Sequence, residues 1–300
     1  MIEACVAFLA MMGIPGGQDV YSFGVNVRTV YVDVSVVGND EFAFGLTVAD
    51  FEVLDEGVRQ KVDLLDRDKI PLTAFLILDT SASVAGERIE HLREAARALL
   101  DELESRDRAA LVTFSHEIQL IGKVGEGVSI FHERLSLASA EGGTSLNDAL
   151  FSSLVLAKEA PGRPLILLFS DGQDTTSWLT ETKLVEVAKR SDALIHAVVV
   201  TPSLVGPGSL RLRREMAEHL RQTAFLREVT GITGGRVWET AGGSDLKEAF
   251  ARIVREMKSR YLLSFSPPGT PREGWHRLTV RVRRRGVDVR ARPGYYSSTR

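Results

Sequence analysis

The stretch AFLILDTSASV, residues 74–84, decides the fold of this 300-residue chain. Five apolar residues lead directly into Asp79, and small hydroxyl-bearing residues follow it at once. Burial of a carboxylate at the end of a core strand costs free energy unless another group pairs with it. The stretch therefore predicts a buried strand that ends at a binding site, and it raises the question of what pairs with Asp79.

Short apolar runs and helical patterns alternate between residues 71 and 257. The runs LTAFLILD, AALVTFS, RPLILLFSD and DALIHAVVV are rich in Leu, Ile and Val, as strands buried on both faces are. Between the first two runs, residues 87–105 place Ile89, Leu92, Ala96 and Leu99 at helical spacing, with charges on the opposite face. This alternation predicts an α/β fold: a doubly wound, mostly parallel sheet flanked by helices.

The segment before this region, residues 23–68, has the period-2 pattern of β-strands. Val30, Val32, Val34 and Val36 fall on one face of a single strand. Two turn signals follow: a capping box formed by Thr47 with Asp50, and a hairpin turn at Glu56-Gly57.

Residues 260–297 return to the β pattern. The runs YLLSFSP, HRLTVRVRR and VDVRARPGYY predict a strand and then a hairpin around Arg285-Gly286. Each flank alone is marginal for an independent core. We therefore expect residues 20–68 and 259–300 to build one discontinuous, β-sandwich-like domain, with the α/β domain of residues 69–258 inserted between them.

The composition is that of an ordinary globular protein, with 44% hydrophobic residues, 26% charged residues and a net charge of -3. This mild acidity gives no overall attraction to nucleic acid or anionic lipid. The chain has one cysteine, Cys5, which excludes an internal disulfide framework and a thiolate metal cluster.

Cys5 lies in the apolar run of residues 4–14, which is short for a membrane span and has the length of a signal peptide's hydrophobic region. The basic residues expected ahead of such a region are missing, so an apolar N-terminal tail stays as an alternative. We expect residues 1–19 to be a signal peptide and the protein to be exported to the periplasm, the cell surface or the medium. A cytoplasmic location is the alternative.

Polar side chains gather where three elements of the α/β region end or begin. Asp79, Ser81 and Ser83 follow the first strand, and Asp171 follows the run PLILLFS. Thr144 stands after paired glycines and opens a helical pattern. Ligands of open α/β sheets bind beyond the carboxyl ends of the strands, so we expect these loops to meet.

All of these groups offer oxygen, and none offers sulfur or imidazole. Hard divalent cations, such as Mg²⁺, Mn²⁺ or Ca²⁺, prefer that ligand set. Two carboxylates also roughly cancel the charge of such an ion. The sequence therefore predicts a divalent cation as the partner of Asp79.

The three motifs resemble those of the von Willebrand factor A domain family. Asp79-Thr80-Ser81-Ala82-Ser83 matches its D-x-S-x-S motif, and Thr144 and Asp171-Gly172 match the second and third motifs. The resemblance covers roughly residues 71–257, and the flanking β segments are similar to those of a bacterial subgroup. It implies a metal-ion-dependent adhesion site whose cation is bound by Asp79, Ser81, Ser83, Thr144 and Asp171 and is completed by a carboxylate of a partner protein.

Further polar and aromatic residues lie near these loops in the sequence. Asp148 and Asp174 are candidates to hydrogen-bond the metal ligands, or else exposed acids at a helix start and a turn. Trp178 stands either on the rim of the site or over the core. The basic stretch of residues 281–292 fits a half-buried strand with a charged outer face better than a nucleic-acid site. Residues 201–215 are the best candidate for a flexible loop.

Taken together, the residues favour a metal-dependent protein-binding module that is not an enzyme and has no integral membrane segment. A metal-dependent hydrolase on the same sheet is one alternative, although no G-x-S-x-G elbow and no glycine-rich phosphate loop is present. The other alternative is a structural module in which the cation stabilises the fold. The identity of the partner does not follow from the sequence.

Overall fold

The stretch of residues 74–84 lies at the centre of the molecule. The computed structural model describes residues 29–39, 41–66, 70–171, 173–201, 210–241, 244–268 and 272–297. The run LTAFLILD forms strand β6 (Leu72–Asp79), in which every residue is buried. Asp79 is its last residue, so the predicted end of the strand is confirmed.

β6 belongs to a six-stranded sheet in the order β11-β10-β9-β6-β7-β8. Its partners are β7 (Arg108–Phe114), β8 (Ile118–Gly122), β9 (Arg163–Ser170), β10 (Leu194–Val200) and β11 (Val237–Thr240). Neighbouring strands run parallel, except that β8 is antiparallel to β7. The strands predicted from the sequence are the central ones, and the mostly parallel sheet is confirmed.

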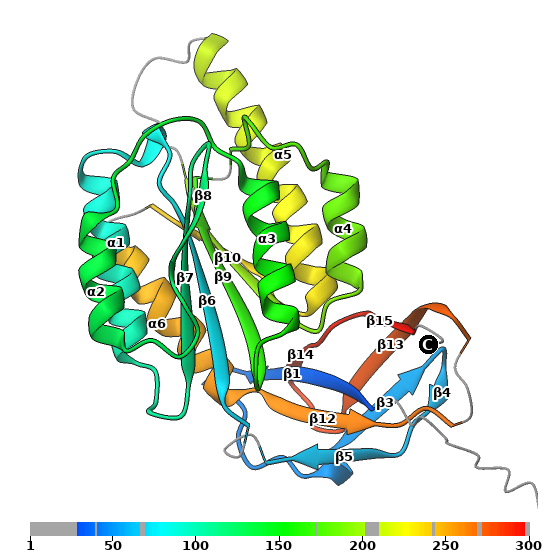
Figure 1. Cartoon of the computed structure of the whole chain (residues 1–300). Coiled ribbons are helices and arrows are strands. Elements are labelled where there is room, and N and C mark those ends of the chain that lie inside the picture. Colours follow the sequence, from blue (N-terminus) through cyan, green and yellow to red (C-terminus); the bar gives the residue numbers. More distant parts are fainter. Residues whose placement is uncertain are drawn as a thin grey trace, which may run out of the picture.

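Helices cover both faces of this sheet (Figure 1). One face packs on α1 (Glu87–Asp101), α2 (Val128–Leu137) and α6 (Ser244–Ser259). The other packs on α3 (Leu146–Lys158), α4 (Glu181–Lys189) and α5 (Leu210–Thr233). In α1, the predicted apolar face of Ile89, Leu92, Ala96 and Leu99 is buried. The doubly wound arrangement follows, because each strand is buried on both sides.

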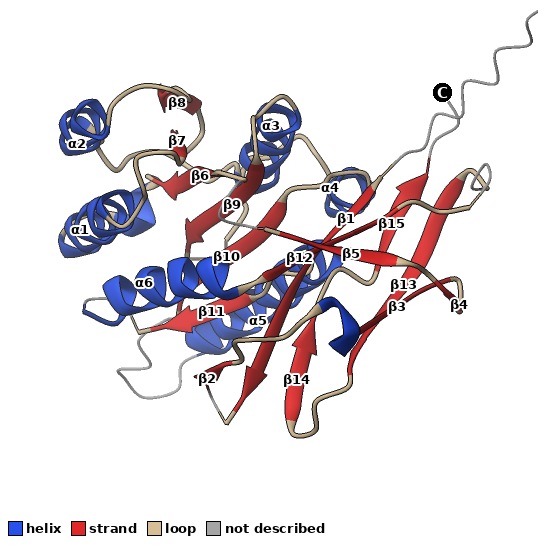
Figure 2. Cartoon of the chain, turned by 90° about the horizontal axis from the view of Figure 1, so that it is seen from below, coloured by secondary structure: helices blue, strands red, loops and turns tan. Residues whose placement is uncertain are grey.

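The two flanks form two antiparallel sheets (Figure 2). The first contains β1 (Val30–Gly38), β2 (Glu41–Phe42), β5 (Val62–Leu65), β12 (Tyr261–Phe265) and β14 (Val287–Arg290). The second contains β3 (Phe51–Asp55), β4 (Val58–Arg59), β13 (Gly274–Val282) and β15 (Gly294–Ser297). Each sheet combines strands from both flanks, and the two share one apolar core. The exact domain boundaries remain a prediction.

The valine face of β1 contributes to this core. Val30, Val32, Val34 and Val36 are all buried, as their alternation predicts. The predicted turn is also present, because β3 and β4 pair through Asp55 and Val58 around Glu56-Gly57. Both turn residues have positive φ, at 48° and 82°, which matches the right-handed twist of the two strands.

The predicted capping box is present at the N-terminus of the short helix η1 (Val48–Asp50). Oδ2 of Asp50 accepts hydrogen bonds from the backbone N–H of Thr47 at 2.7 Å and from its Oγ1 at 2.9 Å. This turn leads the chain from the first flank sheet into the second.

The hairpin predicted around Arg285-Gly286 is wrong. β13 pairs with β3 and β15, whereas β14 pairs with β1 in the other sheet. The chain therefore changes sheets at this bend, where Gly286 has a φ of 72°. The sequence alternates in either arrangement, because Val287 and Val289 pack on the shared core from the first flank sheet, opposite β13.

Two other expectations fall partly or wholly outside the described residues. Residues 1–19, the predicted signal peptide, are among the positions that the structure does not describe. Of the predicted loop at 201–215, the part from Leu210 onward is helical and opens α5. None of the helices described here combines the length and apolar character needed to cross a membrane.

Arginines join the flank sheets to the amino ends of the central strands. Arg163, at the start of β9, forms an ion pair with Asp33 of β1. Nη1 of Arg292 lies 2.9 Å from Oδ1 of Asp192, just before β10. The guanidinium of Arg190 stacks on the ring of Tyr296 at 3.7 Å. The flank sheets therefore contact the end of the α/β sheet that lies opposite Asp79 (Figure 1).

A buried polar network lies near this junction. Oε1 of Glu256 accepts a hydrogen bond from Nη1 of Arg260 at 2.9 Å, and its Oε2 accepts one from Nη2 of Arg236 at 2.9 Å. Neither Glu256 nor Arg260 is more than 1% exposed. Beside them, Nδ1 of the buried His196 accepts a hydrogen bond from Nε1 of Trp238 at 3.2 Å.

Because His196 is buried, we expect the protein to lose stability in mild acid. Burial, above all, lowers its pKa from 6.5 to about 3, so between these values the unfolded chain binds a proton that the folded chain does not. Stability from this group is complete above pH 6.5 and declines as the pH falls toward 3. Between pH 7 and pH 5 we expect about 2 kcal/mol less free energy of unfolding.

The measurement is denaturant unfolding in chelator at both pH values, for the parent and for His196→Asn, whose side-chain oxygen replaces Nδ1. Burial raises the pKa of Asp79 to about 6, which adds a pH dependence of the opposite sign to both proteins. The prediction therefore concerns the difference between them. An equal change in the free energy of unfolding between pH 7 and pH 5 in the parent and the variant would contradict it.

Candidate metal centre

The predicted site residues gather at the carboxyl edge of the central sheet. Asp79 ends β6, and Asp171 follows β9, the parallel neighbour of β6. Thr144 lies in the loop before α3. Hydrogen bonds join the loops: the N–H of Ala82 donates to the carbonyl of Gly142 at 3.0 Å, and the N–H of Glu141 donates to the carbonyl of Thr80 at 2.8 Å.

Asp79 is completely buried. Its Oδ1 accepts a hydrogen bond from the N–H of Ser81 at 2.9 Å, and its Oδ2 accepts one from Oγ of Ser170 at 2.7 Å. Burial and then the charge of Asp171 raise the pKa of Asp79 to about 6, against the effect of these hydrogen bonds. No Lys or Arg among the described residues forms an ion pair with Asp79 or Asp171. The described part of the chain therefore provides no cation for these two neighbouring carboxylates.

The serines of the D-x-S-x-S motif lie close together in the turn after β6. Oγ of Ser81 is 2.9 Å from Oγ of Ser83, and the short helix η3 (Ala82–Val84) holds them there. Ser81 is buried and Ser83 is exposed. The hydroxyl of Thr80 instead donates to the carbonyl of Phe114 at 3.1 Å, which ties the turn to β7.

Thr144 is held through its backbone. Its N–H donates to Oγ1 of Thr175 at 2.8 Å, and its carbonyl accepts the N–H groups of Thr175 and Thr176. The residue is 4% exposed, and its hydroxyl makes no hydrogen bond to the residues that the structure describes. The N-cap of α3 is Ser145, not Thr144. The Thr144 hydroxyl is therefore available to a ligand.

The paired glycines before Thr144 have a steric role. Gly142 has a φ of 74°, and a Cβ there would lie 2.0 Å from Nδ1 of His116. A Cβ on Gly143 would lie 2.8 Å from Cγ2 of Thr176. Larger residues would push the loop away from its neighbours, so the glycines allow Thr144 to approach the edge.

Asp171 is half-buried, and its Oδ1 accepts the N–H of Gln173 at 3.2 Å. Gly172, its predicted partner in the third motif, lies outside the described residues.

Asp148 and Asp174 bind the loop that follows Asp171. Asp148 accepts the N–H of Trp178 at 2.9 Å and that of Leu179 at 2.8 Å. Asp174 accepts the N–H of Asn147 at 3.2 Å and that of Ser177 at 3.1 Å. Both carboxylates thus position backbone. Their predicted hydrogen bonds to metal ligands remain a prediction.

Sequence reasoning missed four residues that organise the site. Ser170 binds Asp79, Thr175 and Thr176 bind the Thr144 loop, and His116 lies against Gly142. Ser170 and the two threonines carried a weak signal, because they stand next to or near Asp171 in a hydroxyl-rich run. His116 carried none, because only the folded chain brings it to Gly142.

The donor set fits a hard cation. No group of three or more His, Cys, Asp or Glu side chains placed to hold a metal occurs in the described part of the chain. The candidate site instead has two carboxylates and hydroxyls from separate loops, which suit Mg²⁺, Mn²⁺ or Ca²⁺ rather than a soft metal.

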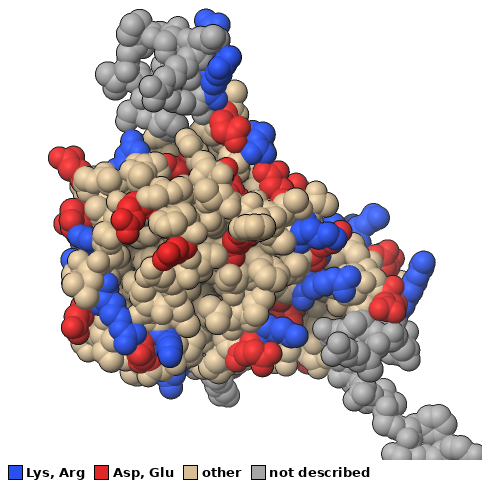
Figure 3. Space-filling model, turned by 45° about the horizontal axis from the view of Figure 1, so that its top comes forward, with Lys and Arg blue, Asp and Glu red and all other residues tan. Residues whose placement is uncertain are grey.

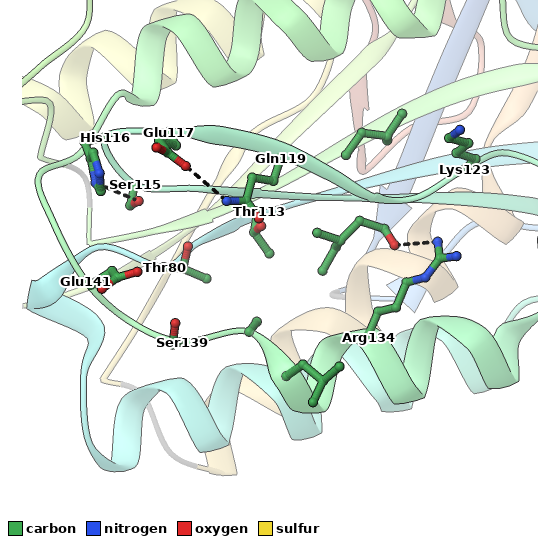
Figure 4. Close-up of a pocket in the computed structure, with 14 residues that line it drawn as sticks. Thr80, Thr113, Ser115, His116, Glu117, Gln119, Lys123, Arg134, Ser139 and Glu141 are labelled. Atoms are coloured by element: carbon green, nitrogen blue, oxygen red, sulfur yellow. Dashed lines mark hydrogen bonds between the residues drawn. The ribbon is translucent and has the colours of Figure 1, made fainter.

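A groove of about 500 Å³ adjoins this edge. Figure 4 shows Thr80, His116 and Glu141 at one end of it, and Lys123 and Arg134 at the other. Charges of both signs are interspersed over the face seen in Figure 3, without a broad patch of one sign. Trp178 is 94% exposed, so it does not cover the core.

Removal of the Thr144 hydroxyl should weaken cation binding and leave the fold intact. Thr144→Ala deletes a neutral oxygen that has no hydrogen bond in the described structure, while the backbone bonds of the loop persist. Titration calorimetry with Mg²⁺ should show roughly 10- to 100-fold weaker binding, with an unchanged melting temperature in chelator. A lower melting temperature in chelator with unchanged Mg²⁺ affinity would contradict the assignment of Thr144 as a ligand.

Comparisons with known proteins agree with the sequence motifs. Residues 74–173 match the family described as von Willebrand factor type A domain. Inter-alpha-trypsin inhibitor heavy chain H4 of Sus scrofa is 33% identical over 126 residues, which cover 38% of this chain and 14% of that protein. An uncharacterized protein of Synechocystis sp. is 29% identical over 150 residues, which cover 48% of this chain and 35% of that protein. The match thus spans a minor part of both relatives.

Solved structures show the same fold at low sequence identity. A von Willebrand factor type A protein from Catenulispora acidiphila has a TM-score of 0.52 and 13% identity, over 92% of this chain and 76% of that chain. The D319A mutant of the PilB minor pilin from Streptococcus sanguinis has a TM-score of 0.51 and 12% identity, over 63% and 62%. With the family match over β6 to β9, these likenesses show that the chain contains a von Willebrand factor type A domain.

Proposed function

We propose that the chain is a metal-ion-dependent, adhesion-type protein-binding module. Its cation, Mg²⁺ or alternatively Mn²⁺ or Ca²⁺, is bound by two carboxylates and three hydroxyls: Asp79, Asp171, Ser81, Ser83 and Thr144. An Asp or Glu carboxylate of a partner protein completes the site. The cation supplies positive charge and an exchangeable coordination position.

The pair of carboxylates carries this proposal. Asp79 is fully buried beside Asp171, and the described residues include no basic group paired with either. An unpaired buried charge costs free energy, so a counter-ion at this position would stabilise the fold. A divalent cation supplies that charge, and the hydroxyls supply neutral oxygens around it.

Other side chains of the chain orient the donors. Ser170 and the N–H of Ser81 fix the two oxygens of Asp79 from the protein side. Thr175 and Thr176 hold the loop of Thr144. Pre-organised donors lose little entropy when the ion binds, so such contacts favour affinity.

The surroundings suit a protein partner. The groove next to the edge has room for the partner's polypeptide segment on one side of its Asp or Glu residue. Trp178 stands in a loop whose backbone is held by Asp148 and Asp174, and it offers an exposed aromatic of the kind that is enriched at the energetic centres of protein interfaces. Export to the periplasm, the cell surface or the medium would place this surface in reach of such partners.

A hydrolase on the same edge is less well supported. His116 lies against Gly142 of the Thr144 loop, and its Nδ1 is 3.3 Å from Oγ of its own neighbour Ser115. That contact joins adjacent residues and no carboxylate orients the ring among the described hydrogen bonds. A nucleophile and base held by a third group are the usual signature of covalent catalysis.

A capture experiment tests the proposal against a purely structural cation. The full chain serves as bait for extracts of the source organism, with Mg²⁺, with chelator, and as the Thr144→Ala variant with Mg²⁺. We expect the same partner to be lost in the last two conditions. Capture that survives both would indicate a stabilising cation, or none, and would overturn an adhesion-type site.

A further inference from the structure

The flank sheets carry a basic surface that the proposed function does not use. The bend between β13 and β14 exposes three consecutive arginines, Arg283, Arg284 and Arg285. Its backbone is fixed to the neighbouring turn, because the N–H of Arg283 donates to the carbonyl of Asp50 at 2.9 Å. Lys61 is exposed and lines a hollow together with Arg283. We call these four residues the basic surface.

Large apolar side chains stand among these cations. Phe44 is 64% exposed and lines one hollow together with Arg284 and Arg285. Val48 is 43% exposed and lines the next hollow together with Arg283 and Lys61. Both hollows include residues of the bend between β13 and β14. Apolar and basic groups therefore share one face.

Three acids lie near these cations. The exposed Glu41 lines the hollow of Phe44, Arg284 and Arg285, whereas Asp50 and Glu52 are engaged elsewhere. The carboxylate of Asp50 caps Thr47, and hydrogen bonds from Thr47 and then the charges of Arg283 and Arg284 lower its pKa. Glu52 lies 3.9 Å from Arg59 and 3.6 Å from Arg281. Within the described part of the chain, no salt bridge involves a residue of the basic surface. The four cations of the basic surface outnumber Glu41, so this face is positive although the chain has a net charge of -3.

We propose that this face docks on an anionic lipid bilayer. The arginines and Lys61 contact lipid phosphates, and Phe44 and Val48 enter the boundary between headgroups and acyl chains. Basic residues beside exposed apolar ones are the signature of interfacial binding. A merely solvated strand face explains the charges, whereas an anionic bilayer also accommodates the exposed Phe44 and Val48 that lie among them. Single-stranded nucleic acid would require several stacking aromatics, and only Phe44 stands here.

The position of this face is compatible with the candidate metal centre. The flank sheets contact the amino ends of β9 and β10 through Arg163 and Arg292. Asp79 lies at the carboxyl end of β6, the opposite edge of the same sheet. A docked molecule therefore keeps its candidate metal edge away from the bilayer. The inference is independent of the proposed function, because no metal ligand belongs to this face.

Vesicle co-sedimentation of the full chain tests the inference. Vesicles of phosphatidylcholine with about 30% phosphatidylglycerol should bind the protein at about 0.1 M salt, and pure phosphatidylcholine should not. Arg285→Gln should weaken binding about fivefold, and Phe44→Ser should weaken it as well. Arg255→Gln, which neutralises an exposed arginine on α6, is the matched control and should bind like the parent.

The apolar run of residues 4–14 could also bind a bilayer. The effects of Arg285→Gln and Phe44→Ser on vesicle binding therefore decide whether the basic surface is responsible. Circular dichroism and melting temperature confirm that each variant folds. Binding that is absent, equal on neutral vesicles, or equally affected by Arg255→Gln would overturn the inference. Binding to a polyanion such as heparin without binding to vesicles would do the same.

Discussion

Replacement of Asp79 by Asn should abolish high-affinity cation binding. The substitution keeps the shape of the side chain and removes the buried charge that no basic group among the described residues balances. Loss of a charged ligand should exceed the effect of losing a neutral one such as Thr144, so we expect Mg²⁺ affinity to fall more than about 100-fold. Titration calorimetry measures it, and circular dichroism should stay unchanged.

The apo protein gives this experiment a second readout. Because Asp79 and Asp171 repel each other in the absence of an ion, Asp79→Asn should not lower the melting temperature in chelator. Asp101→Asn, at the exposed end of α1, is a control that should leave affinity unchanged. If Asp79→Asn binds Mg²⁺ as tightly as the parent, the site lies elsewhere.

Glu256→Gln should cause a large loss of stability. The variant leaves Arg260, which is 0% exposed, without the carboxylate that now lies 2.9 Å from its Nη1. Removal of one partner from a buried ion pair costs about 3–5 kcal/mol, because an uncompensated charge stays in the core. Guanidinium chloride unfolding at pH 7 measures the change.

Two further variants separate charge from packing at Glu256. Glu248→Gln, on the exposed side of the same helix, should change the free energy of unfolding by less than about 0.5 kcal/mol. The double variant Glu256→Leu with Arg260→Met should recover most of the loss, since it removes both charges. A Glu256→Gln protein as stable as the parent would show that the pair has no such role.

The central sheet was predictable because its strands are continuous apolar runs, for which burial on both faces leaves few alternatives. β8 was missed, because Ile118 and Leu120 are partly exposed at the sheet edge and show little more than a short alternation. The β13–β14 bend was misassigned for a different reason. Alternation shows which residues face a core, but not which of two layers provides the neighbouring strand.

The candidate ligands were identifiable from motifs because each stands at the end of a recognisable element. The groups that orient them were not. Ser170 is recognisable as the partner of Asp79 only when β6 and β9 are known to be neighbours. His116 meets Gly142 across loops that no periodicity connects. The neighbours of a side chain depend on register, which the local sequence does not reveal.

A crystal structure of the full chain grown with Mn²⁺ tests the central claim most directly. Anomalous scattering locates the ion without reference to any assumed ligand. The account predicts one peak at the carboxyl edge, within bonding distance of oxygens contributed by Asp79, Asp171, Ser81, Ser83 and Thr144, directly or through water. No peak at that edge, or a peak coordinated by other residues, would contradict it.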